Sequence, residues 1–246
     1  MVKTLPTELP AVRPDPRPIS PPLVLASASP RRRELLAALG ANFTVIATDA
    51  EEQAIVPPPA IAAALPPLPL PPADHPTLLA WRKAHTARAH APEAVVLGAD
   101  TVVALHNKVL NKPADAAHAQ EMLASLSGRS HMVYTGLCVL RGEQYWLDVV
   151  AAEVEFHPLS AATIEAYIAT GEPLDKAGAY GVQGRGGELV RSVRGSYTAV
   201  VGLPLPATHR LLSAAGVVGL HDPAVTYQRW LASQGKEPLP CPPSLP

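Results

Sequence analysis

The distribution of proline limits where this chain can form regular structure. Of its 29 prolines, seven fall in residues 1–22, nine in 57–76 and five in 238–246. Proline fixes φ and has no N–H to donate. These three stretches are therefore not expected to contain helices or central strands.

The same clusters predict a domain organisation. We expect a disordered tail over 1–21, one folded domain over 22–220 with a proline-rich insertion at 54–76, and a C-terminal tail over 221–246. The insertion is interpreted as a tolerated surface loop. A ligand for a proline-binding domain is the functional alternative.

Charge, cysteine content and hydropathy exclude several classes of protein. The formal net charge of −1 gives no support for binding to nucleic acid or to an acidic membrane surface. Cys138 and Cys241 lie far apart and form no CxxC motif, which fits a reducing compartment and predicts no zinc site. No segment approaches the ~20 apolar residues of a membrane span, and the N-terminus has no signal-peptide core. We therefore expect a cytoplasmic protein with no nucleic-acid or membrane partner.

Strand-like and helix-like segments alternate through the rest of the chain. Apolar runs predict strands over 22–27, 42–48, 94–105, 131–140, 145–156, 188–193 and 198–205. Capping residues and helical spacing predict helices over 30–39, 76–91, 115–128 and 160–170, and near 206–215. This order, with some hairpins, predicts an α/β protein with a mixed, curved sheet.

The segment SASPRRR, residues 27–33, places positive charge at the start of a predicted helix. A helix N-terminus offers free N–H groups and a partial positive charge, so Arg31 and Arg32 in its first turn are locally unfavourable. A bound phosphate would reverse that effect, and the serine hydroxyls would add donors. The alternative is a solvated basic face, which suits Arg33 and Glu34.

Asp100 is the only charged residue in the apolar run from Val95 to Leu105. A carboxylate there is costly unless it is paired, binds a metal or lies where the strand opens onto a cleft. Such an Asp suits general-base work on water. The alternative is an Asp that caps a bulge or turn. If the carboxylate is isolated, its replacement by Asn is expected to preserve or even raise stability.

A glycine-rich segment follows at 172–187, with five glycines in residues 178–187. Glycine allows the backbone to pack against a flat ligand, and the amide of Gln183 can pair with a base edge. Asp175 and Lys176 place opposite charges beside it. The segment lacks the Walker pattern and the context of a dinucleotide-binding motif.

Several other residues give weaker signals. Lys83 and Lys112 are candidate phosphate ligands, with solvated lysines as the alternative. Glu51 and Glu52 are candidate metal ligands, with an acidic surface turn as the alternative. His131 is interpreted as structural rather than catalytic.

Together these segments resemble the Maf-type nucleoside triphosphate pyrophosphatases. The matching motifs, in the order of that family, are LASASPRRREL, VLGADTVV, NKP, LSGRSHMVYTG, EPLDKAGAYGVQGRGG and GSYTAVVGLPL, spanning about residues 23–215. The resemblance implies an elongated α/β fold with a nucleotide cleft between two lobes. It also implies a cytoplasmic homodimer that uses a divalent cation, Mg²⁺ or Mn²⁺, to cleave a nucleoside triphosphate into monophosphate and pyrophosphate.

The resemblance also assigns roles to residues. Asp100 matches the proton acceptor, and Arg31, Thr101 and Gln183 match positions that set specificity. Residues that match the lining of the same cleft are assigned to phosphate (Ser27, Arg32, Lys83 and Lys112) and to metal (Asp100 and Glu52). The insertion at 54–76 departs from the family pattern and separates Glu52 from Lys83.

The motif DKAGAYGVQG resembles the branch of the family that acts on dTTP and UTP. Hydrolysis of dTTP and UTP is therefore the predicted activity. A preference for 7-methyl-GTP or a broad specificity remains as an alternative within enzymes. A non-enzymatic regulator of cell division, bound to partners through the proline segments, is the alternative outside them.

Overall fold

The computed structural model describes residues 20–48, 50 and 53–235. The predicted tail over 1–21 lies almost entirely outside this part of the chain, and Glu51 and Glu52 lie outside it as well. Among the described residues, seven strands form one sheet, in which β4 pairs only with β3 and the others follow the order β2-β1-β3-β5-β6-β7. No described helix has the length and apolar character needed to cross a membrane.

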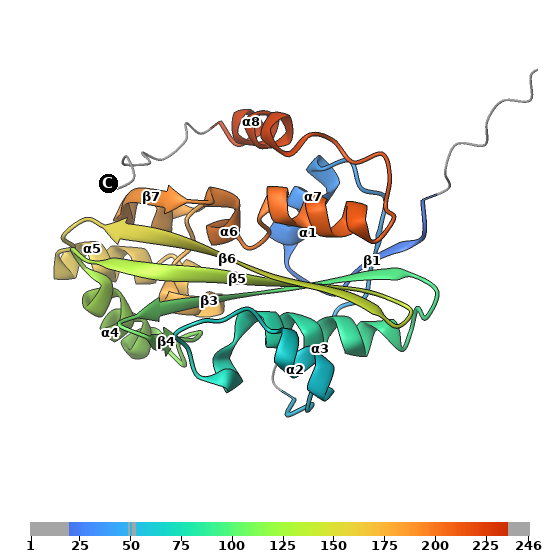
Figure 1. Ribbon diagram of the computed structural model, residues 1–246. Helices are drawn as coiled ribbons and strands as arrows, with labels where there is room; N and C mark the ends of the chain where they lie inside the picture. Colours follow the sequence, from blue (N-terminus) through green and yellow to red (C-terminus); the bar gives the residue numbers. More distant parts are fainter. Residues whose placement is uncertain (1–19, 49, 51–52, 236–246) are drawn as a thin grey trace, which may run out of the picture.

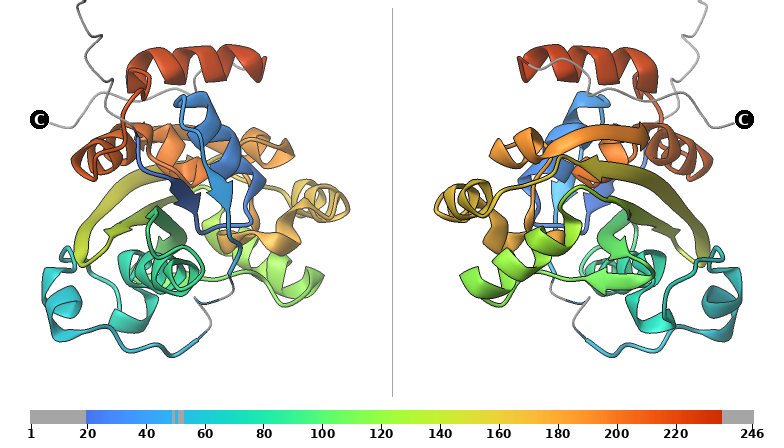
Figure 2. Two further views of the ribbon diagram at one scale, coloured as in Figure 1. Left: turned by 90° about the vertical axis from the view of Figure 1, so that its right-hand side faces the viewer. Right: turned by 90° about the vertical axis from the view of Figure 1, so that its left-hand side faces the viewer.

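The sheet is mixed because its two ends are built differently. At one end β1 (Leu23–Leu25) pairs in parallel with β2 (Thr44–Val45) and β3 (Val95–Leu105). The remaining pairs are antiparallel and involve β4 (Lys108–Leu110), β5 (Ser130–Arg141), β6 (Gln144–Phe156) and β7 (Val190–Gly195). Long curved β3, β5 and β6 give the molecule its length (Figures 1 and 2). The predicted mixed, curved α/β fold is confirmed.

Helices cover both faces of the sheet. The helix α3 (Pro76–Arg88) lies on one face, and α1 (Pro30–Ala38), α6 (Tyr197–Val201) and α7 (Leu205–Ala214) lie on the other (Figure 1). Two further helices, α4 (Ala116–Leu126) and α5 (Ala161–Ile168), pack at the far end of the long strands. Short 3₁₀ turns at Glu172–Asp175, Ala177–Ala179 and Arg185–Leu189 connect α5 to β7.

The apolar strand β3 is buried on both faces over most of its length. Leu97 belongs to the larger core cluster, whereas Val96 belongs to the cluster beneath α3. The helix α3 can approach the sheet closely because Gly98 on β3 and Gly136 on β5 have no side chain. A Cβ on Gly98 would lie 2.1 Å from Ala80 O, and a Cβ on Gly136 would lie 2.2 Å from the backbone of α3. This close packing brings α3 over the middle of β3.

The C-terminal segment differs from its prediction. Residues predicted as a tail from 221 onward form α8 (Pro223–Ser233), whose Trp230 and Leu231 are buried in the main core. Trp230 also donates from Nε1 to Glu34 Oε1 of α1 at 2.8 Å. Asp222 caps the helix and Pro223 occupies its first turn, where the missing N–H costs no hydrogen bond. The domain therefore extends to at least 233, and residues 236–246 lie outside the described part.

The strand predicted over 198–205 is also wrong. This segment contains the short helix α6, which begins after Ser196 and ends at Gly202. The Ser196 side chain accepts from Ala199 N at 3.2 Å, and Gly202 has a φ of 120°, which ends the helix. The Ser196 cap and the Gly202 stop favour a helix, and they outweigh the strand preference of the β-branched residues between them.

The insertion at 54–76 was predicted to contain no helix, and this prediction is wrong. It contains α2 (Pro59–Ala64) and a 3₁₀ turn at Pro72–Asp74. Pro59 occupies the first helical position, and the five residues after it favour a helix. Leu68 and Leu70 then pack against the small apolar cluster formed by Val102, Ala104 and Tyr134. The insertion therefore covers part of the sheet.

Candidate active site

One cavity of about 570 Å³ opens between the start of α1 and the segment 172–184, with the middle of β3 between them. Eight of the nine residues to which the family resemblance assigns a role line it. These are Ser27, Arg31, Arg32, Lys83, Asp100, Thr101, Lys112 and Gln183. The ninth, Glu52, lies outside the described residues. Five separate segments of the chain thus converge on one cavity.

The start of α1 holds Arg32 in a fixed position. Its Nε donates to Gly202 O at 2.9 Å, and its Nη1 donates to Ser27 Oγ at 3.2 Å. The Ser29 side chain caps the helix by accepting from Arg32 N at 3.5 Å. Arg32 is buried and Arg31 is half-buried, whereas Arg33 is exposed and does not line the cavity. Arg31 and Arg32, the two arginines predicted to face an anion, therefore line the cavity, and Arg33 faces solvent as the sequence predicts.

A chain of hydroxyl groups continues from Arg32 into the core. Thr135, which is fully buried on β5, donates from Oγ1 to Ala199 O at 2.7 Å and lies 2.8 Å from Thr101 Oγ1. Because the single Thr135 proton goes to that carbonyl, Thr101 donates to Thr135. Thr101 Oγ1 in turn accepts from Arg32 Nη2 at 3.2 Å. The Thr101 proton thus points into the protein, and this hydroxyl holds Arg32 in place.

Replacing Thr135 with the nearly isosteric Val should lower the free energy of unfolding by ~1–3 kcal/mol, because the Ala199 carbonyl and the Thr101 hydroxyl lose a buried partner. The KM for nucleotide should rise as well, since Arg32 loses its orientation. Thermal unfolding and steady-state kinetics measure the two effects. Thr208→Val is the matched control, because Thr208 is fully buried and its Oγ1 has no hydrogen-bond partner within the described part of the chain. Equal changes in the free energy of unfolding in both variants would contradict a stabilising role for the hydrogen bonds of Thr135.

Asp100 is paired rather than isolated. Lys83 Nζ of α3 lies 2.6 Å from Asp100 Oδ1, and the two side chains are 7% and 13% exposed. The close approach of α3 at Gly98 brings this lysine within reach. The ion pair offsets much of the cost of burying either charge. It also fixes one carboxylate oxygen of Asp100 at the wall of the cavity. The insertion at 54–76, which precedes Lys83 in the sequence, does not prevent this lysine from reaching the cavity.

The carboxylates around the cavity limit how a divalent cation is held. Three line it, namely Asp100, Glu172 and Asp175. Glu172 accepts hydrogen bonds at both oxygens, and Asp175 pairs with Lys176 at 2.6 Å. Among the residues that the structure describes, no cluster of three or more His, Cys, Asp or Glu could bind a metal. Asp100 Oδ2 has no hydrogen-bond partner among those residues, so Asp100 fits a cation that takes its other ligands from phosphate, water or Glu52.

The wall opposite α1 comes from residues 172–184, and it contains charges that the sequence analysis did not assign to the site. Lys176 lines the cavity and donates from Nζ to Glu172 O at 2.8 Å. Burial acts to raise the pKa of Asp175, but the Lys176 hydrogen bond and the positive charges of Lys176 and Arg31 leave it below its usual value. Arg31 and Asp175 therefore influence one another across the cavity mouth. For Asp175 and Lys176, the available sequence signal was their position in the DKAG motif.

Tyr180 completes this wall and rests on His131. His131 Nε2 lies 2.8 Å from the Tyr180 hydroxyl, and the two rings and Phe156 pack edge to face. Burial lowers the pKa of His131 to about 4 and raises that of Tyr180. His131 is therefore neutral at pH 7, and these contacts support a structural role.

The glycine-rich segment packs against the protein itself. A Cβ on Gly184 would lie 2.3 Å from both carboxylate oxygens of Glu172, and one on Gly186 would lie 2.5 Å from the Tyr167 hydroxyl. Gly178 has a φ of 69° and packs against Val103. Contacts within the protein therefore account for glycine at these three positions, and the prediction that the backbone packs against a flat ligand stays a prediction.

Comparison with known proteins identifies the family. Among solved structures, the Staphylococcus aureus Ham1 protein aligns with a TM-score of 0.35 at 13% identity, covering 55% of this chain and 71% of that chain. The dTTP/UTP pyrophosphatase of Yersinia pestis is 48% identical over 205 residues, which cover 81% of this chain and 98% of that protein. The dTTP/UTP pyrophosphatase of Moorella thermoacetica is 49% identical over 197 residues, which cover 79% and 95%. The profile of the family described as Maf-like protein matches residues 22–215, and this chain belongs to that family.

Proposed function

We propose that this protein hydrolyses dTTP and UTP to the nucleoside monophosphate and pyrophosphate. Relatives described as dTTP/UTP pyrophosphatases are nearly half identical to it over almost their whole length. The observation that carries the proposal is one cavity that combines a cationic wall at α1 with a paired, partly accessible Asp100. That combination suits cleavage of a phosphoanhydride by water.

The triphosphate lies against α1 in this proposal. Arg31 and Arg32 offer charge-assisted donors, and the α1 N-terminus adds a partial positive charge. Lys112, which is exposed beyond β4, adds a positive charge at the cavity. These positive groups stabilise the negative charge that accumulates on the leaving pyrophosphate.

Asp100 acts as the general base. Lys83 fixes Oδ1, and Oδ2 accepts a proton from the attacking water. The water oxygen forms a new P–O bond as the α–β anhydride bond breaks, and pyrophosphate carries away the electron pair of that bond. One water is consumed and one proton is released for each nucleotide cleaved.

A divalent cation, Mg²⁺ or Mn²⁺, is part of the proposal, with Asp100 and Glu52 as its protein ligands. When bound, it would neutralise phosphate charge and polarise the scissile anhydride. This is supported by the partly exposed carboxylate of Asp100 in the cavity lining, because carboxylate oxygens suit a hard cation shared with phosphate.

Specificity is assigned to Arg31, Thr101 and Gln183. The Gln183 amide offers one acceptor and two donors and can pair with the edge of a pyrimidine. Thr101 contributes by holding Arg32, as its hydrogen bonds indicate.

We expect dTTP and UTP to be hydrolysed with a higher kcat/KM than 7-methyl-GTP when the purified protein is assayed with Mg²⁺ or Mn²⁺. Chromatography should identify the monophosphate and pyrophosphate as products, and EDTA should abolish the reaction. A best rate with 7-methyl-GTP would overturn the pyrimidine preference. Absence of pyrophosphate release from every nucleotide, with both metals, would favour the non-enzymatic regulator.

The resemblance to the family supports two further proposals, a homodimer and a cytoplasmic location. Light scattering on the purified protein measures the first, and fractionation of cells measures the second.

A further inference from the structure

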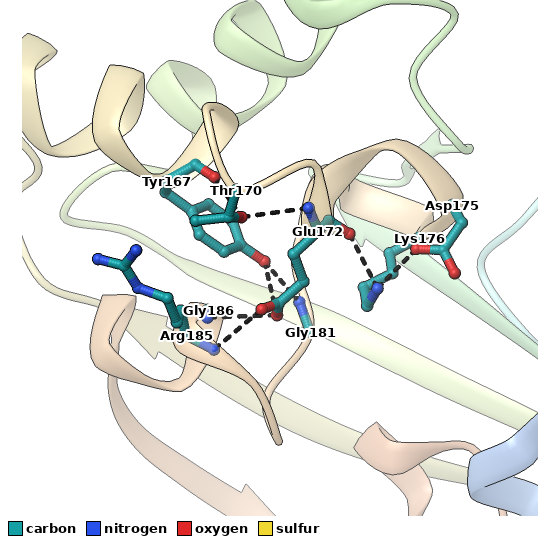
Figure 3. A network of polar contacts seen from close by, with 8 residues as sticks. All are labelled: Tyr167, Thr170, Glu172, Asp175, Lys176, Gly181, Arg185 and Gly186. Atoms are coloured by element: carbon teal, nitrogen blue, oxygen red, sulfur yellow. Dashed lines mark hydrogen bonds and ion pairs between the residues drawn. The ribbon is translucent and has the colours of Figure 1, made fainter.

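The carboxylate of Glu172, which lines the cavity, lies at the centre of a hydrogen-bond network (Figure 3). Its Oε1 accepts from the Tyr167 hydroxyl at 3.0 Å and from Gly186 N at 3.4 Å, and its Oε2 accepts from Arg185 N at 3.0 Å. Tyr167 Oη also accepts from Gly181 N at 3.1 Å. Two side chains thus bind backbone amides on both sides of Gln183.

The glycines of this loop are needed for those contacts. A Cβ on Gly184 or Gly186 would clash with Glu172 or Tyr167, as described above, and a Cβ on Gly181 would lie 2.7 Å from Lys176 Cε. Gln183 is flanked by these close approaches and lines the cavity. The loop therefore has little freedom to move while Glu172 stays in place.

The Tyr167 hydroxyl is a permanent donor in this network. Its side chain belongs to α5 and is 4% exposed. Burial raises the pKa of Tyr167, and the negative charges of Glu172 and Asp175 raise it further. The hydroxyl therefore stays protonated at any physiological pH and keeps Glu172 oriented.

The Glu172 carboxylate occupies the amides of Arg185 and Gly186 much as a bound anion would. Those amides are therefore engaged by the protein and do not hold a phosphate. The loop is consequently suited to the uncharged end of the substrate, and the phosphates are left to the arginines of α1.

We propose that Glu172 and Tyr167 are positioning residues that hold the 181–186 loop so that Gln183 meets the base of the nucleotide. This inference rests on the proposed pyrophosphatase function. It assigns to Glu172 a role in specificity through the loop, without contact to the reacting atoms.

Glu172→Gln and Tyr167→Phe test this proposal. In Glu172→Gln an NH₂ group replaces one oxygen and faces an N–H donor, so the loop is released. We expect the KM for dTTP and UTP to rise about tenfold, the preference over 7-methyl-GTP to shrink, and kcat to change less than about threefold. Glu165→Gln, exposed on α5, and Tyr145→Phe, exposed on β6, are the matched controls.

A double variant shows whether the effect passes through Gln183. If it does, Glu172→Gln combined with Gln183→Ala should raise KM no more than Gln183→Ala alone. Fully additive effects, or a fall in kcat with unchanged KM and preference, would overturn the positioning role.

Hydrogen exchange separates this proposal from the function it rests on. The amides of Arg185 and Gly186 should be protected in the wild type and should exchange at least about tenfold faster in Glu172→Gln. If the amides are protected but the protein releases no pyrophosphate, the positioning role of Glu172 is retained and the proposed function is rejected. If exchange is unchanged in Glu172→Gln and the protein hydrolyses dTTP, only the positioning role of Glu172 is rejected.

Discussion

Asp100→Asn should reduce kcat for dTTP about 10²–10⁴-fold while the protein remains folded. Asn is nearly isosteric with Asp but cannot accept a proton from water at neutral pH, and it is a poorer ligand for a hard cation. Steady-state kinetics at saturating nucleotide measure the change. Asp115→Asn is the matched control, because Asp115 caps α4 away from the cavity and Asn caps helices equally well.

The ion pair changes what this substitution should do to stability. An isolated carboxylate predicts unchanged or higher stability on replacement, and that expectation no longer holds, because Lys83 would keep a buried charge without its counter-charge. The introduced amide can still accept a hydrogen bond from Lys83, so we expect a loss smaller than the ~3–5 kcal/mol that removal of one partner from a buried pair costs. Asp100→Asn/Lys83→Gln should recover stability without recovering activity. Recovered turnover would assign the defect to charge balance rather than to a missing base.

Metal titration separates the two roles proposed for Asp100. If higher Mn²⁺ restores the rate of Asp100→Asn, Asp100 is chiefly a metal ligand. If the rate stays low at saturating metal while nucleotide still binds, Asp100 is chiefly the base. Near wild-type turnover in the folded variant would eliminate Asp100 from the mechanism.

Local signals were sufficient for most of the fold. The apolar run of β3, the Ser29 cap with Pro30 at the start of α1, and the Asp115 cap of α4 each predict an element that the structure contains. The errors arose where two signals competed. The tail predicted over 221–246 includes Pro223, although this proline begins a helix whose Trp230 packs into the core.

The residues of the candidate site could be predicted, but their contacts could not. Lys83 and Asp100 lie in separate motifs, and their pairing depends on the approach of α3 to the sheet at Gly98 and Gly136. The role of Thr135 was likewise hidden, because a threonine on a buried strand is usually just part of the core. Its significance depends on Thr101 and Ala199, which come together only in three dimensions.

Arg32→Ala should lower kcat/KM for dTTP by about 10²-fold or more, because each charge-assisted hydrogen bond contributes ~1.5–3 kcal/mol and tenfold corresponds to about 1.4 kcal/mol. Three N–H groups of Arg32 bind Ser27, Thr101 and Gly202. These bonds fix the plane of the guanidinium before substrate arrives, so its contribution to phosphate binding requires no reorganisation. Arg32→Lys should recover only part of the loss, because an ammonium group cannot make the same fork of bonds.

Arg33→Ala isolates the effect of position from that of charge. Arg33 is the next residue on α1 and carries the same charge, but it is exposed and outside the cavity lining. Since exposed charges contribute little, its removal should change kcat/KM less than about threefold. The thermal stability of Arg32→Ala must be measured in parallel, because the Gly202 carbonyl loses its donor. Equal kinetic losses in Arg32→Ala and Arg33→Ala would mean that α1 acts through its net charge alone, and the phosphate-binding role of Arg32 would be withdrawn.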